Sequence, residues 1–116
     1  MTDIVIYHNP RCSKSRSTLT LLEDKGIKPT IIEYLKTPPT PETLKSILQK
    51  LDLTAFELLR RNEAVYKELD LANKTLSEEQ LIHIMAENPK LIERPIIVNG
   101  EKAAIGRPPE NVLKIL

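Results

Sequence analysis

Residues 4–16 read IVIYHNPRCSKSR, and this stretch decides the fold of a chain of 116 residues. The apolar run from Ile4 to Tyr7 predicts a short buried strand, which Pro10 in the following turn interrupts. A segment with helical spacing begins near Cys12 or Ser13, so the only cysteine of the chain lies at a strand-to-helix turn. The unpaired N–H groups at a helix N-terminus favour a thiolate over a thiol.

The charged residues near this cysteine are all basic. Arg11, Lys14 and Arg16 surround it, and no acidic residue occurs from Ile4 to Leu22, although the whole chain has 17 basic and 16 acidic residues. An ordinary thiol has a pKa of about 8.5, whereas helix N-termini and nearby cations lower the pKa to roughly 3.5–7.5. We therefore interpret Cys12 as a nucleophile outside the apolar core, not as a small buried hydrophobe.

The flanking segments predict a sheet. The first helix ends at Gly26, and the β-branched residues of 30–35 predict a second strand, parallel to the first in a βαβ unit. Near the C-terminus, residues 95–98 and 101–105 predict a hairpin, in which Asn99-Gly100 would supply the two positive φ angles of a type I′ turn. A short helix carrying Val112, Leu113 and Leu116 closes the chain.

The middle of the chain predicts short helices over about 40–88. Thr40 caps a helix that starts at Pro41, and two capping boxes follow, Thr54 with Glu57 and Ser77 with Gln80. We expect the helix after Thr54 to carry Leu59 and Arg60. About 50 residues of this kind bury too little surface to fold alone, so we expect an insertion within one domain of residues 1–116.

The order βαβ, helices, ββα predicts an α/β protein with a thioredoxin-like fold, a mixed four-stranded sheet and an inserted helical lobe. In that arrangement, a proline just before the third strand often has a cis peptide bond and faces the active-site thiol. Pro95 occupies this position, so we expect a cis Arg94–Pro95 bond.

Composition excludes several classes of function. A net charge of +1 and the presence of only three Tyr, one Phe and no Trp argue against nucleic-acid binding. No apolar run approaches the 18 or so residues that span a membrane, and the N-terminus lacks a signal-peptide pattern. One cysteine and two histidines give no metal-ligand cluster, and a single cysteine suits a reducing compartment. We expect a soluble cytoplasmic protein without a tightly bound cofactor or metal.

A thioredoxin-type oxidoreductase that works alone needs a second cysteine to resolve the first. Here the pattern is Cys12-Ser13-Lys14-Ser15, so a resolving thiol has to come from another molecule. Two interpretations of Ser15 stay open, a hydrogen bond to the thiolate and plain helix capping. A phosphatase loop would need an arginine six residues after the cysteine, where this chain has Thr18.

Arginines indicate what the thiol acts on. Arg94 and Arg107 each precede a proline and flank the predicted hairpin, which in such a sheet brings both towards the thiol, and Arg60 and Arg61 lie on the helical lobe. Guanidinium groups that converge beside a helix N-terminus form an oxyanion site.

These motifs together resemble one family. Residues 7–16, Leu59-Arg60, residues 93–96 and residues 105–109 are similar to the glutaredoxin-dependent arsenate reductase (ArsC) family over essentially the whole chain. The resemblance implies that Cys12 is the nucleophile, that Arg60, Arg94 and Arg107 bind arsenate, and that His8 promotes thiolate formation. It also implies glutathione as co-substrate and glutaredoxin as partner, because arsenate reduction leaves a mixed disulfide of Cys12 and glutathione.

Two other interpretations fit the same fold. Spx-like regulators bind RNA polymerase, but they commonly carry a Cys-x-x-Cys switch, which Ser15 excludes here. A glutathione-linked thiol oxidoreductase with another substrate would share the anion site, since arginines also hold phosphate, sulfate or a carboxylate.

Overall fold

The computed structural model describes residues 4–116, which divide into two compact units. The first unit holds the N-terminal residues through Thr37 together with Arg94–Leu116, and the second holds Pro38–Glu93. The second unit contains the predicted helical insertion of about 40–88. The grouping of residues 1–116 into one domain stays a prediction.

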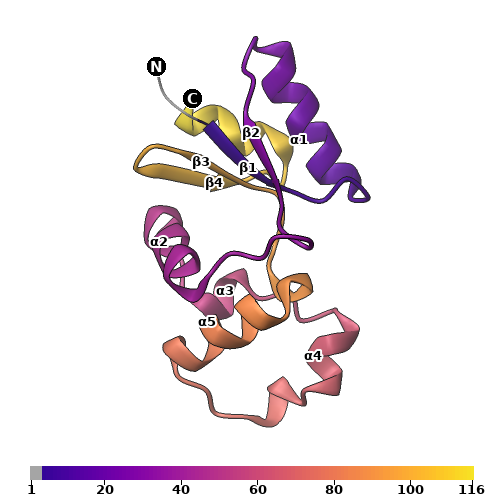
Figure 1. Cartoon of the computed structure of the whole chain (residues 1–116), viewed down its shortest axis with the longest axis vertical. Helices are drawn as coiled ribbons and strands as arrows, with labels where there is room; N and C mark the ends of the chain where they lie inside the picture. The colour runs from indigo at the N-terminus through magenta and orange to yellow at the C-terminus, as the bar shows by residue number, and fades with distance from the viewer. Residues whose placement is uncertain (1–3) are drawn as a thin grey trace. The chain divides into compact units, whose positions relative to one another are not determined.

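The first unit contains the mixed four-stranded sheet that the sequence predicts. In residues 4–116 the strands are β1 (Ile4–His8), β2 (Thr30–Glu33), β3 (Ile96–Asn99) and β4 (Lys102–Ile105), in the order β2-β1-β3-β4. β1 runs parallel to β2 and antiparallel to β3, and β3 runs antiparallel to β4 (Figure 1). The parallel βαβ start and the antiparallel hairpin are both confirmed.

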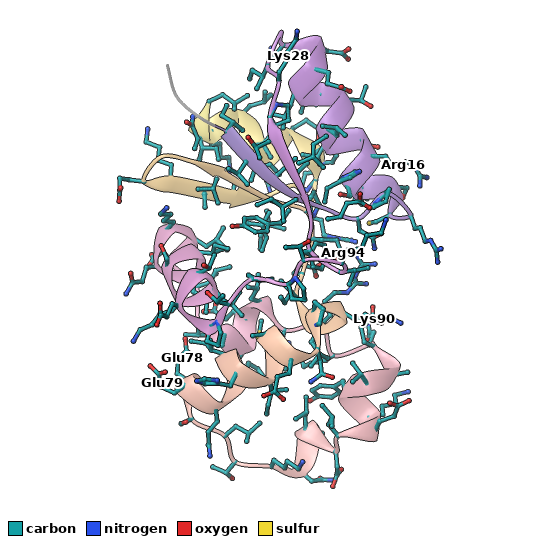
Figure 2. All side chains as sticks on the ribbon, in the orientation of Figure 1. Arg16, Lys28, Glu78, Glu79, Lys90 and Arg94 are labelled. Atoms are coloured by element: carbon teal, nitrogen blue, oxygen red, sulfur yellow. The ribbon has the colours of Figure 1, made fainter. Side chains whose placement is uncertain are left out.

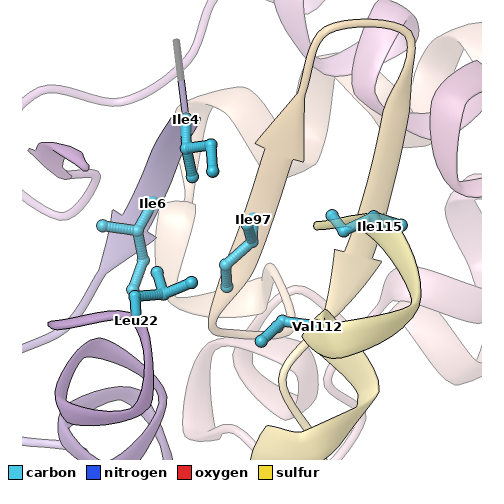
Figure 3. Packing of buried hydrophobic residues seen from close by; sticks show 6 residues of the cluster. All are labelled: Ile4, Ile6, Leu22, Ile97, Val112 and Ile115. Atoms are coloured by element: carbon cyan, nitrogen blue, oxygen red, sulfur yellow. The ribbon is translucent and has the colours of Figure 1, made fainter. Parts of the chain in front are cut away.

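The core of this unit lies between the sheet and the helix α1 (Ser13–Asp24), which packs beside the C-terminal 3₁₀ helix η3 (Pro109–Ile115). Alternate residues of β1 are buried, so Ile4, Ile6 and His8 share one face of the strand. The buried cluster comprises Ile4, Ile6, Leu22, Ile97, Val112 and Ile115 (Figure 3). α1 packs on this cluster through Leu22, near its C-terminal end.

The second unit contains several helices, and the sequence predicts where three of them start. They are α2 (Pro41–Leu51), α3 (Ala55–Leu58), α4 (Ala64–Glu68) and α5 (Glu78–Glu87), with the short 3₁₀ helices η1 (Leu71–Asn73) and η2 (Pro89–Leu91). Thr40 caps α2, and both expected capping boxes are present. Glu78 and Glu79, labelled in Figure 2, stand in the first turn of α5, where acidic side chains favour the helix dipole.

One helix is shorter than expected. α3 ends at Leu58, so Leu59 and Arg60 are not helical. Leu59 is extended, with φ −72° and ψ 131°, and forms an isolated bridge with Ile92. Backbone pairing to a segment more than thirty residues away therefore overrides the local helical pattern, and local spacing gives no signal of such a partner.

The hairpin turn also differs from the expectation. Asn99 pairs with Lys102 in the β3–β4 ladder, so the loop residues are Gly100 and Glu101 instead of Asn99 and Gly100. Only Gly100 has a positive φ, 63°, which fits the type II′ pattern of glycine at the first loop position and not type I′. The side chain of Asn99 also donates a hydrogen bond to the carbonyl of Ile115.

Two further elements depart from the sequence pattern. β2 ends at Glu33, because the N–H groups of Lys36 and Thr37 both donate to the Glu33 carbonyl and form a turn. The closing helix is a 3₁₀ helix, in which residues three apart lie on one side. Val112 and Ile115 are therefore its buried side chains, while Leu113 and Leu116 are exposed.

The expected cis Arg94–Pro95 bond is confirmed, and Arg107–Pro108 is cis as well. Both prolines adjoin the hairpin, one before β3 and one after β4. None of the helices formed by residues 4–116 is long and apolar enough to cross a membrane.

The packing of β3 predicts a large effect of truncating Ile97, which is fully buried in the cluster. Ile97→Ala should lower the free energy of unfolding by about 2–5 kcal/mol, because it leaves a cavity under the sheet. Ile31→Ala is the matched control, since Ile31 is a strand isoleucine that is 48% exposed, and it should cost less than about 1 kcal/mol. Urea unfolding of both variants tests this, and equal losses would contradict the assigned core.

Candidate active site

Cys12 is the N-cap residue of α1, as expected from the sequence. Its backbone is extended, its N–H donates to the Asn9 carbonyl at 3.0 Å, and its carbonyl accepts from the Arg16 N–H at 3.0 Å. The residue is 9% exposed, more buried than we expected, but it is not a member of the apolar cluster. The thiol therefore lies at the positive end of the helix dipole in a largely enclosed position.

The surroundings of Cys12 act on its pKa in opposite directions. Burial has the largest single effect and raises the pKa, because it penalises the charged form. The backbone N–H groups of Ser15 and Lys14, followed by the charge and a hydrogen bond of Arg94, lower the pKa. The lowering effects together prevail, so the pKa of Cys12 lies below that of an ordinary thiol.

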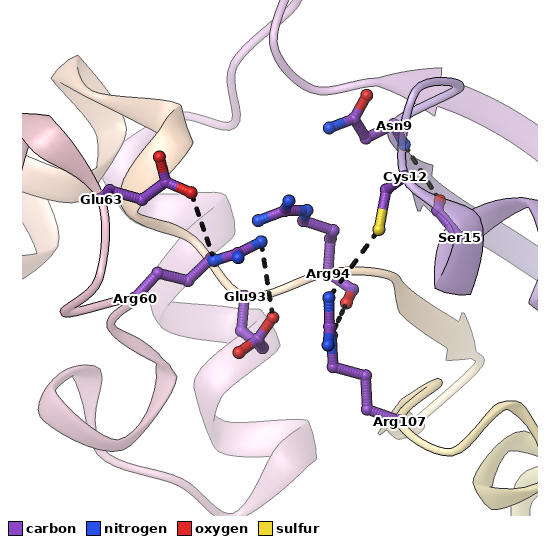
Figure 4. A network of polar contacts seen from close by, with 8 residues as sticks. All are labelled: Asn9, Cys12, Ser15, Arg60, Glu63, Glu93, Arg94 and Arg107. Atoms are coloured by element: carbon purple, nitrogen blue, oxygen red, sulfur yellow. Dashed lines mark hydrogen bonds and ion pairs between the residues drawn. The ribbon is translucent and has the colours of Figure 1, made fainter.

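Two arginines of the first unit converge on the sulfur. The Arg107 Nη2 atom lies 3.8 Å from Cys12 Sγ, and Arg107 Nε donates to the Arg94 carbonyl at 2.8 Å (Figure 4). Arg94 acts on the same sulfur through its charge. The two guanidinium groups that flank the hairpin are thus brought to the thiol, which is the placement that the sequence predicted for them.

Ser15 is fully buried, and its hydroxyl links three segments of the site. Ser15 Oγ accepts from the Asn9 N–H at 3.0 Å and shares a 2.6 Å hydrogen bond with His8 Nδ1. The hydroxyl therefore joins α1 to the end of β1 and to the turn between them, which neither interpretation from the sequence described. The backbone N–H of Ser15 is the group that acts on Cys12.

His8 is buried at the end of β1, and its pKa is below the usual value. Burial is the main cause, the charge of Glu33 opposes it, and the charge of Arg16 adds to the lowering. A neutral imidazole is therefore favoured at neutral pH. Its Nδ1 atom is hydrogen-bonded to the Ser15 hydroxyl, so His8 would affect the thiolate indirectly, by positioning Ser15.

Arg11 and Arg16, the other candidate cations, are both exposed. The Arg11 N–H donates to Asn9 Oδ1 at 3.0 Å, and Arg16 Nη1 donates to the Pro10 carbonyl at 2.9 Å. These contacts brace the turn before Cys12, and direct support of the thiolate by either side chain stays a prediction. Asn9 is the residue that sequence reasoning missed, although asparagine before proline is a recognisable turn signal.

Arg60 belongs to the helical unit and is half-buried among acidic residues there. Its Nε lies 3.5 Å from Glu63 Oε1 and its Nη1 lies 3.9 Å from Glu93 Oε1. The Arg60 N–H donates to the Leu91 carbonyl at 2.7 Å. Arg61 instead lies over the Phe56 ring, 4.6 Å from its centroid. The role of Arg60 at the thiol stays a prediction.

Residues 4–116 contain no group of three or more His, Cys, Asp or Glu side chains that could hold a metal ion. The site at Cys12 combines a thiol of lowered pKa with the guanidinium groups of Arg94 and Arg107. The fold and this site define a thioredoxin-like protein with a single thiol of lowered pKa.

Comparison with known proteins agrees with this class. A model of the ArsC family matches residues 7–115. The chain is 55% identical over 114 residues to the uncharacterized protein YfgD of Escherichia coli strain K12, covering 97% of this chain and 96% of that protein. It is 50% identical over 114 residues to the arsenate reductase of Haemophilus influenzae, covering 97% and 98%. The chain belongs to the ArsC family.

A solved structure gives the same result for the fold. The structure of the arsenate reductase from Vibrio cholerae matches with a TM-score of 0.95 and 53% sequence identity, covering 99% of this chain and 98% of that one. The thioredoxin-like fold is confirmed.

The electrostatics of the site predict which arginine controls the thiol. Arg94→Gln should raise the pKa of Cys12, because it removes a charge that lowers it. Arg11→Gln is the matched control, since that exposed side chain lies in the preceding turn and is not among the causes of the shift. Iodoacetamide alkylation rates across pH test this, and an unchanged midpoint in Arg94→Gln would contradict the assignment.

The buried His8 predicts a loss of stability in acid. As the pH falls below about 6.5, the unfolded chain binds a proton that the folded His8 resists, so the free energy of unfolding decreases. His8→Asn should flatten this dependence between about pH 7 and 5, whereas His83→Asn, at an exposed position, should keep it. Parallel pH curves for wild type and His8→Asn in urea unfolding would contradict the assignment.

Proposed function

We propose that this protein reduces arsenate to arsenite with Cys12 as the nucleophile. The observation that carries the proposal is a thiol of lowered pKa with two guanidinium groups directed at it. Membership of the ArsC family and relatives named arsenate reductase support the choice of substrate.

The first step joins two anions, which repel each other in water. The Cys12 thiolate attacks pentavalent arsenic, a sulfur–arsenic bond forms, and one oxygen leaves as water after protonation. Arg94 and Arg107 offset the repulsion and orient the oxyanion, because guanidinium groups bind oxyanions through two parallel N–H bonds. Arg60 is proposed as a third ligand, by its match to the family motif.

The second step supplies the electrons. A glutathione thiolate attacks the Cys12 sulfur of the adduct, the sulfur–arsenic bond breaks, and its electron pair leaves on arsenic, which becomes arsenite. Cys12 is left in a mixed disulfide with glutathione, so two thiols together supply two electrons. The chain has no second cysteine, and glutaredoxin therefore has to remove the glutathione by thiol–disulfide exchange. This route places the protein in a glutathione-containing compartment such as the cytoplasm.

The proposal is tested by NADPH oxidation that depends on arsenate, in the presence of glutathione, glutaredoxin and glutathione reductase. The wild-type chain should turn over, and Cys12→Ser should lose all activity because no other thiol is present. Arg94→Lys should chiefly raise the KM for arsenate, since a lysine lacks the planar two-point fork. Arg61→Lys serves as the control, because Arg61 stacks on Phe56.

Three results would contradict the proposal in different ways. Turnover by Cys12→Ser would exclude this nucleophile. No arsenate-dependent rate with a reactive Cys12 would favour a glutathione-linked oxidoreductase with another substrate. Binding to RNA polymerase without redox activity would favour an Spx-like regulator.

A further inference from the structure

Thr18 connects the helix of the nucleophile to the segment that carries Arg107. Its side chain is fully buried in the middle of α1. Thr18 Oγ1 donates to the Lys14 carbonyl at 2.8 Å and lies 3.4 Å from the Gly106 carbonyl. Lys14 is in the first turn of α1, whose N–H groups act on Cys12, so Thr18 contacts both sides of the site.

Gly106 meets Thr18 with no room for a side chain. A Cβ atom added at Gly106 would overlap Thr18 Oγ1, lie 2.8 Å from Pro95 Cγ and lie 3.0 Å from Thr18 Cγ2. Unlike Gly26 and Gly100, Gly106 has no positive φ, so glycine is required here by space and not by backbone conformation. The backbone at Gly106 therefore packs directly against the Thr18 side chain of α1.

The residues at this close approach are bonded or adjacent to both arginines of the site. The Gly106 N–H donates to the Pro95 carbonyl at 2.9 Å, which fixes Gly106 to the residue after Arg94. Arg107, the next residue, donates from Nε to the Arg94 carbonyl and places Nη2 3.8 Å from Cys12 Sγ. The contacts close a ring within one unit, from Cys12 along α1 to Thr18, across to Gly106, and through Arg107 back to the sulfur.

We propose that Thr18 and Gly106 are positioning residues, whose contact sets how closely Arg94 and Arg107 approach the Cys12 thiolate. Neither side of this contact touches the sulfur, so the pair acts through the arginines. The effect on the thiolate is independent of the substrate, and only the effect on oxyanion binding rests on the proposed function.

The test compares alkylation of Cys12 by iodoacetamide across pH in Gly106→Ala and in wild type. The added methyl group should displace Arg107 from the sulfur and, through its 2.8 Å contact with Pro95, also shift Arg94, whose charge lowers the pKa of Cys12. The midpoint should move to higher pH, and the rate at pH 7 should fall by about threefold or more. In Gly106→Ala, arsenate should protect Cys12 from alkylation only at about tenfold higher concentration than in wild type, because oxyanion binding needs both guanidinium groups in place.

Two variants separate positioning from a general loss of stability. Gly100→Ala is the matched control: it places a side chain at φ 63° with open space around it, away from the site. It should lower the melting temperature and leave the alkylation profile unchanged. The double variant Thr18→Ala with Gly106→Ala removes both conflicting Thr18 atoms, so it should recover part of the lost rate, although Pro95 still limits the space.

A wild-type alkylation profile in Gly106→Ala would overturn the proposal. If Gly106→Ala is not recovered folded, Thr18→Val decides, because it keeps the volume and replaces the hydroxyl facing the Gly106 carbonyl with a methyl group. A lower rate in Thr18→Val supports the proposal, and an unchanged rate overturns it. Failure of arsenate to protect wild type would contradict the proposed function, while the alkylation profiles would still decide this inference.

Discussion

The contact between the Cys12 sulfur and the first turn of α1 is the constraint on which the rest of the site depends. The N–H groups of Lys14 and Ser15 favour the thiolate because α1 begins at Ser13, directly after the cysteine. Leu22 anchors the far part of the helix in the core, and the Ser15 hydroxyl fixes the near part to His8 and Asn9. The position of the sulfur therefore depends on a helix that packs on the core near one end and is hydrogen-bonded to His8 and Asn9 near the other.

Burial and charge oppose each other at this sulfur, and their balance explains the chemistry. Enclosure alone would raise the pKa of Cys12 and make it inert, whereas the backbone N–H groups and Arg94 lower it further than burial raises it. Arg107, held by the Arg94 carbonyl, approaches the same atom. Electrostatic groups that stabilise a thiolate in an enclosed site also suit an incoming oxyanion, so one arrangement serves the proposed nucleophile and the proposed substrate.

Local signals predicted most of the fold and the centre of the site. The strand before Pro10 and the capping boxes at Thr54 and Ser77 each have a local physical cause, and each was confirmed. The cis bond before Pro95 was also confirmed, but it was predicted from the order of elements along the whole chain. The end of α3 could not be predicted in this way, because it depends on a distant partner, Ile92 for Leu59, and the Asn99-Gly100 signal predicted the hairpin but not its register. The contact of Thr18 with Gly106 joins residues 88 positions apart and has no local signature.

The most direct test of this account is an ultraviolet absorbance titration of the thiolate in the unmodified chain, with Cys12→Ser as the blank. The account predicts a single ionisation at a lower pH than that of an unperturbed cysteine thiol, assigned wholly to Cys12 because the signal vanishes in the blank. An ionisation at or above that pH would mean that burial outweighs the helix N-terminus and the arginines, and would contradict the central claim.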